Sequence, residues 1–347
     1  MSEALQHVAD MTRSRDRGQV DASLLTALKD LLPLRRALLW RVLGEPGGRR
    51  AWQLVGSHAA GALVPAVDHL GGDAAEPLPY EQLALHVECF EQLGLVQLPV
   101  AAGHGVLLPT ASEREVDGVV ELELDGPLDA AQLRVVQTLL KIHRNFLGLL
   151  DYSERDTLTG LLNRKSFDET FLRATVLEAT RIYGSAAPES QARRRGGLRR
   201  HWLGVLDIDH FKQVNDVHGH LIGDEVLLLV ARILRSTFRF DDRLYRFGGE
   251  EFVVLLTAPD EAAAGIAFER LRVNLGSYSF PRVGRITGSI GYSDVRPGDT
   301  PQAAFERADR AVYHAKQHGR DQVQSQARLV DAGLLDESGI VGEIELF

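Results

Sequence analysis

Two glutamates that directly follow two glycines have the types and the spacing to hold a cation beside a phosphate. Gly248, Gly249, Glu250 and Glu251 lie between two β-prone apolar runs, and Gly-Gly between such runs predicts a hairpin. Both glycines can adopt the positive φ of a tight turn, and their missing side chains let a phosphate approach the backbone. Carboxylates are preferred ligands of divalent cations. A Gly-Gly hairpin is also a common structural turn, so the functional interpretation depends on the surrounding residues.

A second acidic pair ends the apolar run 202–208, which predicts a buried strand. We expect this strand to neighbour the hairpin in one sheet, so Asp207 and Asp209 would converge with the two glutamates. Four converging acids would repel one another and raise their pKa values. A divalent metal relieves that repulsion and takes oxygen ligands, including a backbone carbonyl such as that of Ile208. Such a site can bridge nucleotide phosphates and activate a hydroxyl nucleophile. The alternative is a set of acids at solvent-exposed strand ends.

Basic residues near these acids could bind the phosphates of a nucleotide. Lys212 follows the acidic strand end, and Lys316 and Arg320 lie near the end of the last predicted helix. Lysine offers a point charge and arginine a planar fork of donors. The backbone amides at the start of a helix beginning at Phe211 add an anion site. Any one of these residues could instead be a solvated surface charge.

An amide and a carboxylate follow at Asn215 and Asp224. Together these groups could recognise a base. A carboxylate that accepts from N1–H and the 2-amino group selects guanine over adenine, which lacks that pattern.

The elements expected to position these residues alternate between strands and helices. They are a strand over Trp202–Ile208, a short helix from Phe211, a helix over Val226–Thr237, the glycine hairpin, a helix over Glu261–Leu275, a strand over Thr287–Tyr292 and a helix from Pro301 to His318. This order predicts an α+β, ferredoxin-like fold with a central antiparallel sheet.

Residues 151–325 resemble the GGDEF domain of the diguanylate cyclase family. The matching motifs are DTLTGLLNR (Asp156–Arg164), LDIDHFKQVNDVHGH (Leu206–His220), GGEEF (Gly248–Phe252), SIGYS (Ser289–Ser293) and ADRAVYHAKQHGRD (Ala308–Asp321). The resemblance implies a cyclase-palm fold and a homodimer in which each subunit presents one GTP. It also implies joining of two GTP into cyclic di-GMP with release of two pyrophosphates, with two Mg²⁺ ions (Mn²⁺ as a substitute) per active site.

The resemblance also assigns roles residue by residue. It implies metal binding by Asp207, the Ile208 carbonyl and Glu250. Glu251 would support the metal or deprotonate the 3′-hydroxyl, a division with Glu250 that stays open. The implied GTP-binding residues are His210, Phe211, Lys212, Asn215, Asp224, Gly248, Gly249, Lys316 and Arg320.

A second site is implied upstream of the hairpin, where Arg239 and Asp242 form an RxxD pattern. In the family this position binds the product and inhibits the enzyme, and Arg270 matches a secondary arginine. An ordinary surface ion pair is the alternative.

The N-terminal part predicts a separate domain. Residues 1–128 resemble a GAF-type sensory domain, with a PAS-like domain as the competing interpretation and an unknown small ligand or signal. A helix from Asp21, with Asp21 as its cap, and a helix over Tyr80–Leu93 are expected. Scattered histidines such as His86 could ligate a haem or metal, but surface or core positions are favoured.

We therefore expect four segments in the chain. They are the sensory domain over 1–128, a signalling and dimerisation helix over 129–153, the GGDEF domain over 154–325 and a C-terminal extension over 326–347. The helix carries an apolar stripe wide enough for a coiled-coil seam, or it is the last helix of the sensory domain. The family pattern explains neither the Arg-rich segment 186–200 nor the C-terminal tail.

Composition narrows the class of protein further. The 347 residues include 48 acidic and 39 basic side chains and one cysteine. The acidic balance argues against nucleic-acid binding, and the single Cys89 against disulfides. Without an expected signal peptide or membrane span, a cytoplasmic protein is predicted. A non-catalytic cyclic di-GMP receptor and a GTP-responsive scaffold are the alternatives to a cyclase.

Overall fold

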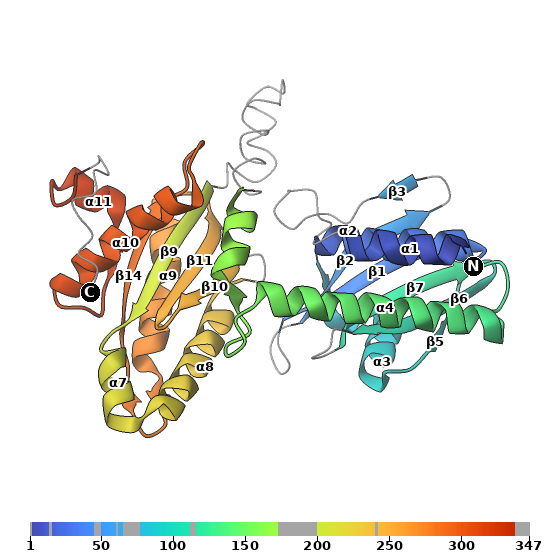
Figure 1. The fold of residues 1–347 in the computed structure, drawn as a ribbon, viewed down its shortest axis with the longest axis horizontal. Coiled ribbons are helices and arrows are strands. Elements are labelled where there is room, and N and C mark those ends of the chain that lie inside the picture. The colour runs from blue at the N-terminus through green and yellow to red at the C-terminus, as the bar shows by residue number, and fades with distance from the viewer. Residues whose placement is uncertain are drawn as a thin grey trace. The chain divides into compact units, whose positions relative to one another are not determined.

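The computed structural model describes residues 2–13, 16–44, 50–59, 62–64, 77–111, 116–172, 200–239 and 242–336. The chain forms two compact units, an N-terminal unit Met1–Ser153 and a C-terminal unit Glu154–Phe347 (Figure 1). Apart from Arg200, the predicted Arg-rich segment 186–200 lies outside the described residues, as does the tail beyond Asp336.

The N-terminal unit is built on a sheet of seven strands in the order β3-β2-β1-β7-β6-β5, with β4 paired to β2. Helices α2 and α4 pack on a core that includes Leu24, Leu28, Val120 and Leu139. A second apolar cluster around Trp52 packs residues of α3. The elements are α1 (Ser2–Arg13), α2 (Arg17–Leu31), β1 (Leu34–Leu43), β2 (Ala51–Ala59), β3 (Ala62–Val64), β4 (Leu78–Pro79), a 3-10 turn (Tyr80–Gln82), α3 (Ala84–Gln92), β5 (Val96–Leu98), β6 (His104–Ala111), β7 (Val116–Leu124) and α4 (Ala130–Glu154).

Two local predictions for this unit were wrong. The cap of α2 is Asp16, whose side chain accepts from the Gln19 N–H, and not Asp21. The helix expected over Tyr80–Leu93 is broken at Leu83 into the 3-10 turn and α3. His86 is a buried core histidine, as favoured, and it bonds to Glu121 at 3.0 Å.

Asp21 instead lies in a buried polar contact between three elements. Arg41 of β1 donates from Nη2 to both of its carboxylate oxygens at 2.8 Å, and Nε2 of His143 in α4 lies 2.8 Å from Oδ1. Burial would raise the pKa of Asp21, but the Arg41 guanidinium and the His143 hydrogen bond outweigh it and lower the pKa. Asp21 thus holds α2, β1 and α4 together through charge.

The predicted helix over 129–153 is α4, and its apolar stripe is buried within the N-terminal unit. Val136, Leu139, Leu147 and Leu150 lie in the core beneath the sheet. The residues expected to form a dimer seam therefore pack inside their own unit, while Leu149 and Tyr152 near the helix end are exposed. Among the described helices, α4 included, none has the length and apolar composition needed to cross a bilayer.

The C-terminal unit is an α+β fold around a six-stranded sheet in the order β15-β14-β9-β11-β10-β8. The four central strands are antiparallel, as predicted, and the two outer pairs are parallel. The elements are β8 (Leu162–Asn163), a helix described over 164–172, β9 (Arg200–Ile208), α7 (Phe211–His218), α8 (His220–Thr237), β10 (Arg243–Gly248), β11 (Glu251–Ala258), α9 (Glu261–Ser277), β12 (Ser279–Phe280), β13 (Gly284–Arg285), β14 (Gly288–Asp294), α10 (Pro301–Gln317), β15 (Val323–Ser325) and α11 (Gln326–Asp331).

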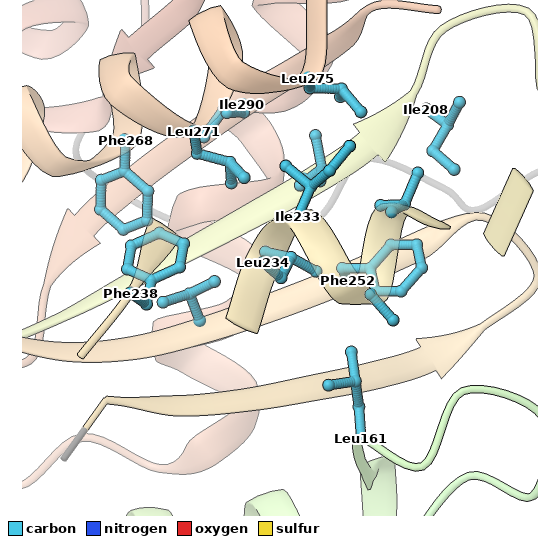
Figure 2. Packing of buried hydrophobic residues seen from close by; sticks show 14 of the residues in the cluster. Leu161, Ile208, Ile233, Leu234, Phe238, Phe252, Phe268, Leu271, Leu275 and Ile290 are labelled. Carbon is cyan, nitrogen blue, oxygen red and sulfur yellow. The ribbon is translucent and has the colours of Figure 1, made fainter. Parts of the chain in front are cut away.

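Helices cover both faces of this sheet. On one face α8 and α9 pack Leu234 and Phe268 against sheet residues such as Ile208, Phe252 and Ile290 (Figure 2). Side chains alternate along β9, so Asp207 points to the opposite face. There α10 contacts β14 and β9, and its alanines are buried. The polar ends of β9 and β11 therefore meet the C-terminal half of α10.

Candidate active site

The glycine hairpin joins β10 to β11 as predicted. Gly248 and Gly249 have φ of 149° and 50°, a region that side-chain-bearing residues rarely adopt. Gly248 pairs with Glu251, so the two turn residues are Gly249 and Glu250. Glu250 is thus at the tip and Glu251 is the first residue of β11.

Arg246, which the sequence analysis did not single out, braces this turn. Its Nη2 donates to the Gly249 carbonyl at 2.9 Å and its Nη1 to Asp156 Oδ1 at 3.0 Å. Asp156 also accepts from the Thr159 amide and hydroxyl. The DTLTG motif therefore fixes an arginine that holds the acidic turn in place.

Asp207 lies directly opposite Glu251 in the register of β9 and β11. It is 7% exposed, and its Oδ2 lies 2.6 Å from Lys316 Nζ. Its Oδ1 is buried and has no hydrogen-bond partner among the described residues. The predicted convergence of Asp207 with the hairpin is present in the structure, and Lys316, predicted to bind phosphates, lies beside it. One carboxylate oxygen of Asp207 is left to bind something else.

Asp207, Glu250 and Glu251 lie where β9 ends and β11 begins, a position that we call the acidic edge. Their carboxylates crowd one another. Burial raises the pKa of Asp207, and Lys316 offsets only part of the effect. Burial also raises the pKa of Glu250, and the charge of Asp207 raises it further. The pKa of Glu251 is raised by burial and then by Asp309 and Asp207. A cation placed among these groups would relieve their repulsion.

Asp209 lies close enough for its charge to raise the pKa of Asp207, but its own carboxylate is already hydrogen-bonded. It is buried, and its carboxylate accepts from the Thr287 hydroxyl at 2.7 Å, the Ser289 hydroxyl at 2.7 Å and the Asp321 amide at 3.0 Å. These donors satisfy both oxygens, because Ser289 of β14 and Thr287 just before that strand place their hydroxyls against the end of β9. Asp209 therefore lies near Asp207, but both of its oxygens already have hydrogen-bond donors.

The fourth acid is Asp309, which the sequence analysis missed. It lies on α10, seven residues before Lys316, and two helical turns place both on one face. Burial raises the pKa of Asp309, Lys316 lowers it, and Asp207 raises it again. The seven-residue spacing from Lys316 is the sequence signal that could have identified it.

The two residues predicted to bind guanine lie together. A Cβ added to Gly223 of α8 would stand 2.0 Å from Asn215 Oδ1, so the Asn215 amide rests on the backbone beside Asp224. Phe211 has its side chain in the core and could offer a ligand only its amide. His210 is exposed with φ of 59°.

The structure brings together only some of the residues predicted to bind the phosphates. Lys316 and Arg320 both act on the pKa of Asp207, which places their charges at the acidic edge. Lys212 lies exposed in the first turn of α7, on a different element, and its approach to the phosphates stays a prediction.

The acidic edge offers oxygen donors of the kind that Mg²⁺ takes together with phosphates and water. The described residues contain no cluster of three or more His, Cys, Asp or Glu side chains arranged to hold a metal alone. Mg²⁺ commonly takes one or two carboxylates and fills its shell with phosphates and water. The unpartnered Asp207 Oδ1, the half-buried Glu250 and the backbone of Ile208, whose N–H donates to the Glu250 carbonyl at 3.4 Å, fit that pattern.

The RxxD residues close a turn between α8 and β10. The Arg239 amide donates to Asp242 Oδ2 at 2.8 Å, and the Asp242 amide donates to the Arg239 carbonyl at 3.1 Å. The Arg239 side chain is exposed. Arg270 of α9 donates to the Thr237 carbonyl at the end of α8, two residues from Arg239. The three residues predicted for this site are therefore neighbours.

Comparison with known proteins identifies the C-terminal unit. Residues 153–322 match the protein-family model described as "Diguanylate cyclase, GGDEF domain". The chain is 36% identical over 227 residues to diguanylate cyclase DgcP of Pseudomonas aeruginosa, covering 64% of this chain and 31% of DgcP. It is 34% identical over 203 residues to diguanylate cyclase DgcM of Escherichia coli, covering 57% of this chain and 45% of DgcM. A solved structure of the coiled coil and GGDEF domain of DgcB from Caulobacter crescentus with c-di-GMP is 29% identical, with a TM-score of 0.45, and the match covers 57% of this chain and all of that one.

The C-terminal unit is thus an α+β domain with an acidic edge, and its sequence places it in the GGDEF family, as the motifs predicted. The chain spans about a third to a half of the length of these two curated relatives.

Proposed function

We propose that this protein is a Mg²⁺-dependent diguanylate cyclase that condenses two GTP into cyclic di-GMP and two pyrophosphates. The observation that carries the proposal is the buried Asp207 oxygen without a partner, opposite Glu251 and beside Lys316, within a GGDEF domain. A receptor that only binds cyclic di-GMP has no need for such an oxygen, so the enzyme is favoured over the receptor and the scaffold.

Different residues of the site would bind the guanine, bind the phosphates and accept the proton. Asn215 and Asp224 would hold the guanine edge, and Lys316 and Arg320 the phosphates. Each 3′-oxygen attacks the α-phosphorus of the other GTP as the bond to pyrophosphate breaks. Glu250 or Glu251 accepts the hydroxyl proton. The raised pKa of each brings it nearer to neutral pH, where a general base works best.

Asp207, Glu250 and the Ile208 carbonyl would hold the metal. When bound, Mg²⁺ supplies positive charge at the phosphates and lowers the pKa of the attacking hydroxyl. The crowding of carboxylates that raises their pKa values supports a cation at this position.

One GTP per subunit means that two subunits must face each other, so the enzyme would act as a homodimer. The N-terminal unit, which we propose to be a GAF-like or PAS-like sensor of an unknown ligand, would set the geometry of the two half-sites. Its last helix, α4, runs without interruption to Glu154, where the GGDEF domain starts, and is fixed to the sensor core by Asp21 and by buried leucines.

The test is incubation of the pure protein with GTP and Mg²⁺, followed by chromatography for cyclic di-GMP. Wild-type protein should form the product, and Glu250→Ala should not. Absence of product at micromolar protein, with both proteins behaving alike, would contradict the proposal.

Gly223→Ala should weaken GTP binding although Gly223 need not touch the nucleotide. Its Cβ would lie 2.0 Å from Asn215 Oδ1 and displace the amide. Losing a hydrogen bond to the base costs about 1–3 kcal/mol, so the KM for GTP should rise by roughly tenfold or more. The control is Gly126→Ala, where an added Cβ meets nothing within 4 Å. An unchanged KM in folded Gly223→Ala would refute the placement of Asn215 at the base.

We also propose product inhibition through Arg239, Asp242 and Arg270. Arg239→Ala should abolish inhibition by cyclic di-GMP and leave the initial rate nearly intact, because the exposed Arg239 side chain belongs to a turn outside the acidic edge. The measurement is the initial rate across added cyclic di-GMP. Equal inhibition of the variant and the wild-type protein would contradict an inhibition site at Arg239.

A further inference from the structure

The turn that carries Arg320 has an unusual backbone. Gly319, Arg320 and Asp321 have φ of 107°, 58° and 44° in succession. For residues with side chains, the left-handed region is unfavourable because Cβ crowds the following carbonyl oxygen. Two such residues in a row persist only where the surroundings hold them in place. The turn follows α10 directly, and its Arg320 amide still bonds to the Ala315 carbonyl at 3.0 Å.

Asp209 holds the backbone of this turn. Its Oδ2 accepts from the Asp321 amide at 3.0 Å, and the hydroxyls of Thr287 and Ser289 fix the carboxylate at 2.7 Å each. Asp209 is 6% exposed, so these are hydrogen bonds to a buried charge. Such bonds are among the stronger ones in proteins.

The side chain of Asp321 holds the same turn from the other side. Its Oδ1 accepts from Arg272 of α9 at 2.7 Å and its Oδ2 from Arg285 of β13 at 3.1 Å. Glu269 binds the same guanidinium of Arg272 through two nitrogens and orients it. Backbone and side chain of Asp321 are thus tied to three separate elements.

We propose that Asp209 and Asp321 are positioning residues that hold the strained turn so that Arg320 meets the triphosphate of the bound nucleotide beside Lys316. The inference rests on the proposed function and deepens it. Asp209, the second acid of the strand end, has both oxygens occupied by hydrogen bonds and joins that strand end to the phosphate-binding turn. Both basic residues are then fixed in position. Lys316 Nζ lies 2.6 Å from Asp207 Oδ2, and Arg320 is part of the anchored turn.

The experiment is a double-mutant cycle read by direct binding. Calorimetry measures the Kd of 3′-deoxy-GTP with Mg²⁺, because this nucleotide lacks the attacking hydroxyl and cannot turn over. Asp209→Ala and Arg320→Ala should each weaken binding by about tenfold, in line with losing one charge-assisted contact. The double variant should bind no more weakly than Arg320→Ala alone, because Asp209 acts through Arg320. A purely structural role would instead lower the melting temperature without this dependence on Arg320.

The matched control is Asp299→Ala. Asp299 also accepts from a backbone amide, that of Arg296 at 2.6 Å, and from an arginine, Arg307 at 2.9 Å, but it lies just before the opposite end of α10. Its removal should leave the Kd unchanged. If Asp209→Ala does not fold, the same cycle with Asp321→Ala decides the question.

The outcomes are distinguishable. Wild-type Kd in folded Asp209→Ala or Asp321→Ala, or losses that add to that of Arg320→Ala, would overturn the inference and leave the proposed function standing. Failure of the wild-type protein to bind 3′-deoxy-GTP would overturn both.

Discussion

Asp207→Asn is expected to lower cyclic di-GMP formation by about a thousandfold and to leave the fold intact. The variant removes a charged oxygen that has no partner in the described protein and that we propose to face the metal. Charge stabilisation of several kcal/mol in the transition state corresponds to about three orders of magnitude in rate. The measurement is the initial rate with saturating GTP and Mg²⁺, with Asp331→Asn on the exposed surface of α11 as control.

The thermal stability of Asp207→Asn should not fall with its activity. The pKa of Asp207 is raised in the folded protein, chiefly by burial, so its charged form disfavours folding at neutral pH. A neutral asparagine removes that penalty, and the melting temperature should stay level or rise. A rate loss accompanied by unfolding would contradict a catalytic role for the carboxylate.

Asp21→Ala is expected to reduce the free energy of unfolding of the N-terminal unit by about 3–5 kcal/mol, the usual cost of removing one partner of a buried ion pair. Asp21 is 2% exposed, and its loss leaves the buried side of Arg41 without its bidentate partner. Urea unfolding followed by the fluorescence of Trp40 and Trp52, both in this unit, measures the change.

The matched control is Asp125→Ala, which removes an exposed ion pair with Arg35 and should cost less than about 1 kcal/mol. Acid provides a second check. The folded-state pKa of Asp21 is lowered, so its stabilisation is complete above the ordinary pKa of about 3.9 and is lost as the pH falls further. The difference between wild type and Asp21→Ala should therefore shrink in acid. A difference that grows in acid would contradict the lowered pKa.

The acidic hairpin could be predicted from the sequence because its chemistry is local. Gly249 and the glutamates after it are neighbours in the chain, and the apolar runs beside them indicate strands. Asp207 was predicted to meet this hairpin, and the sheet register brings it there. The position of α10 places Lys316, predicted to bind phosphates, beside Asp207. The antiparallel α+β layout followed from the alternation of strands and helices.

Other parts of the site depend on contacts across the sheet, which the sequence did not reveal. Asp209 has the same two-residue spacing that suggested convergence with Asp207, but two hydroxyls and an amide about 80 to 110 positions away bind it. Arg246 looks like an ordinary strand residue until the Gly249 carbonyl and Asp156 are seen beside it. A similar limit explains Asp21, which resembles a helix cap but pairs with Arg41 and His143.

The stripe of α4 shows why periodicity alone does not identify a partner. Its apolar residues suit a coiled coil or a sheet surface equally, and in the structure they lie in the N-terminal core. Homodimerisation and the GAF-like assignment of the N-terminal unit therefore remain proposals.

The most direct test of the account is the stoichiometry of products formed from GTP. Wild-type protein with Mg²⁺ should release two pyrophosphates for each cyclic di-GMP, and Glu250→Ala should release neither. Release of inorganic phosphate with GDP, or of pyrophosphate with only a linear dinucleotide, would contradict a cyclase at the Asp207–Glu251 edge.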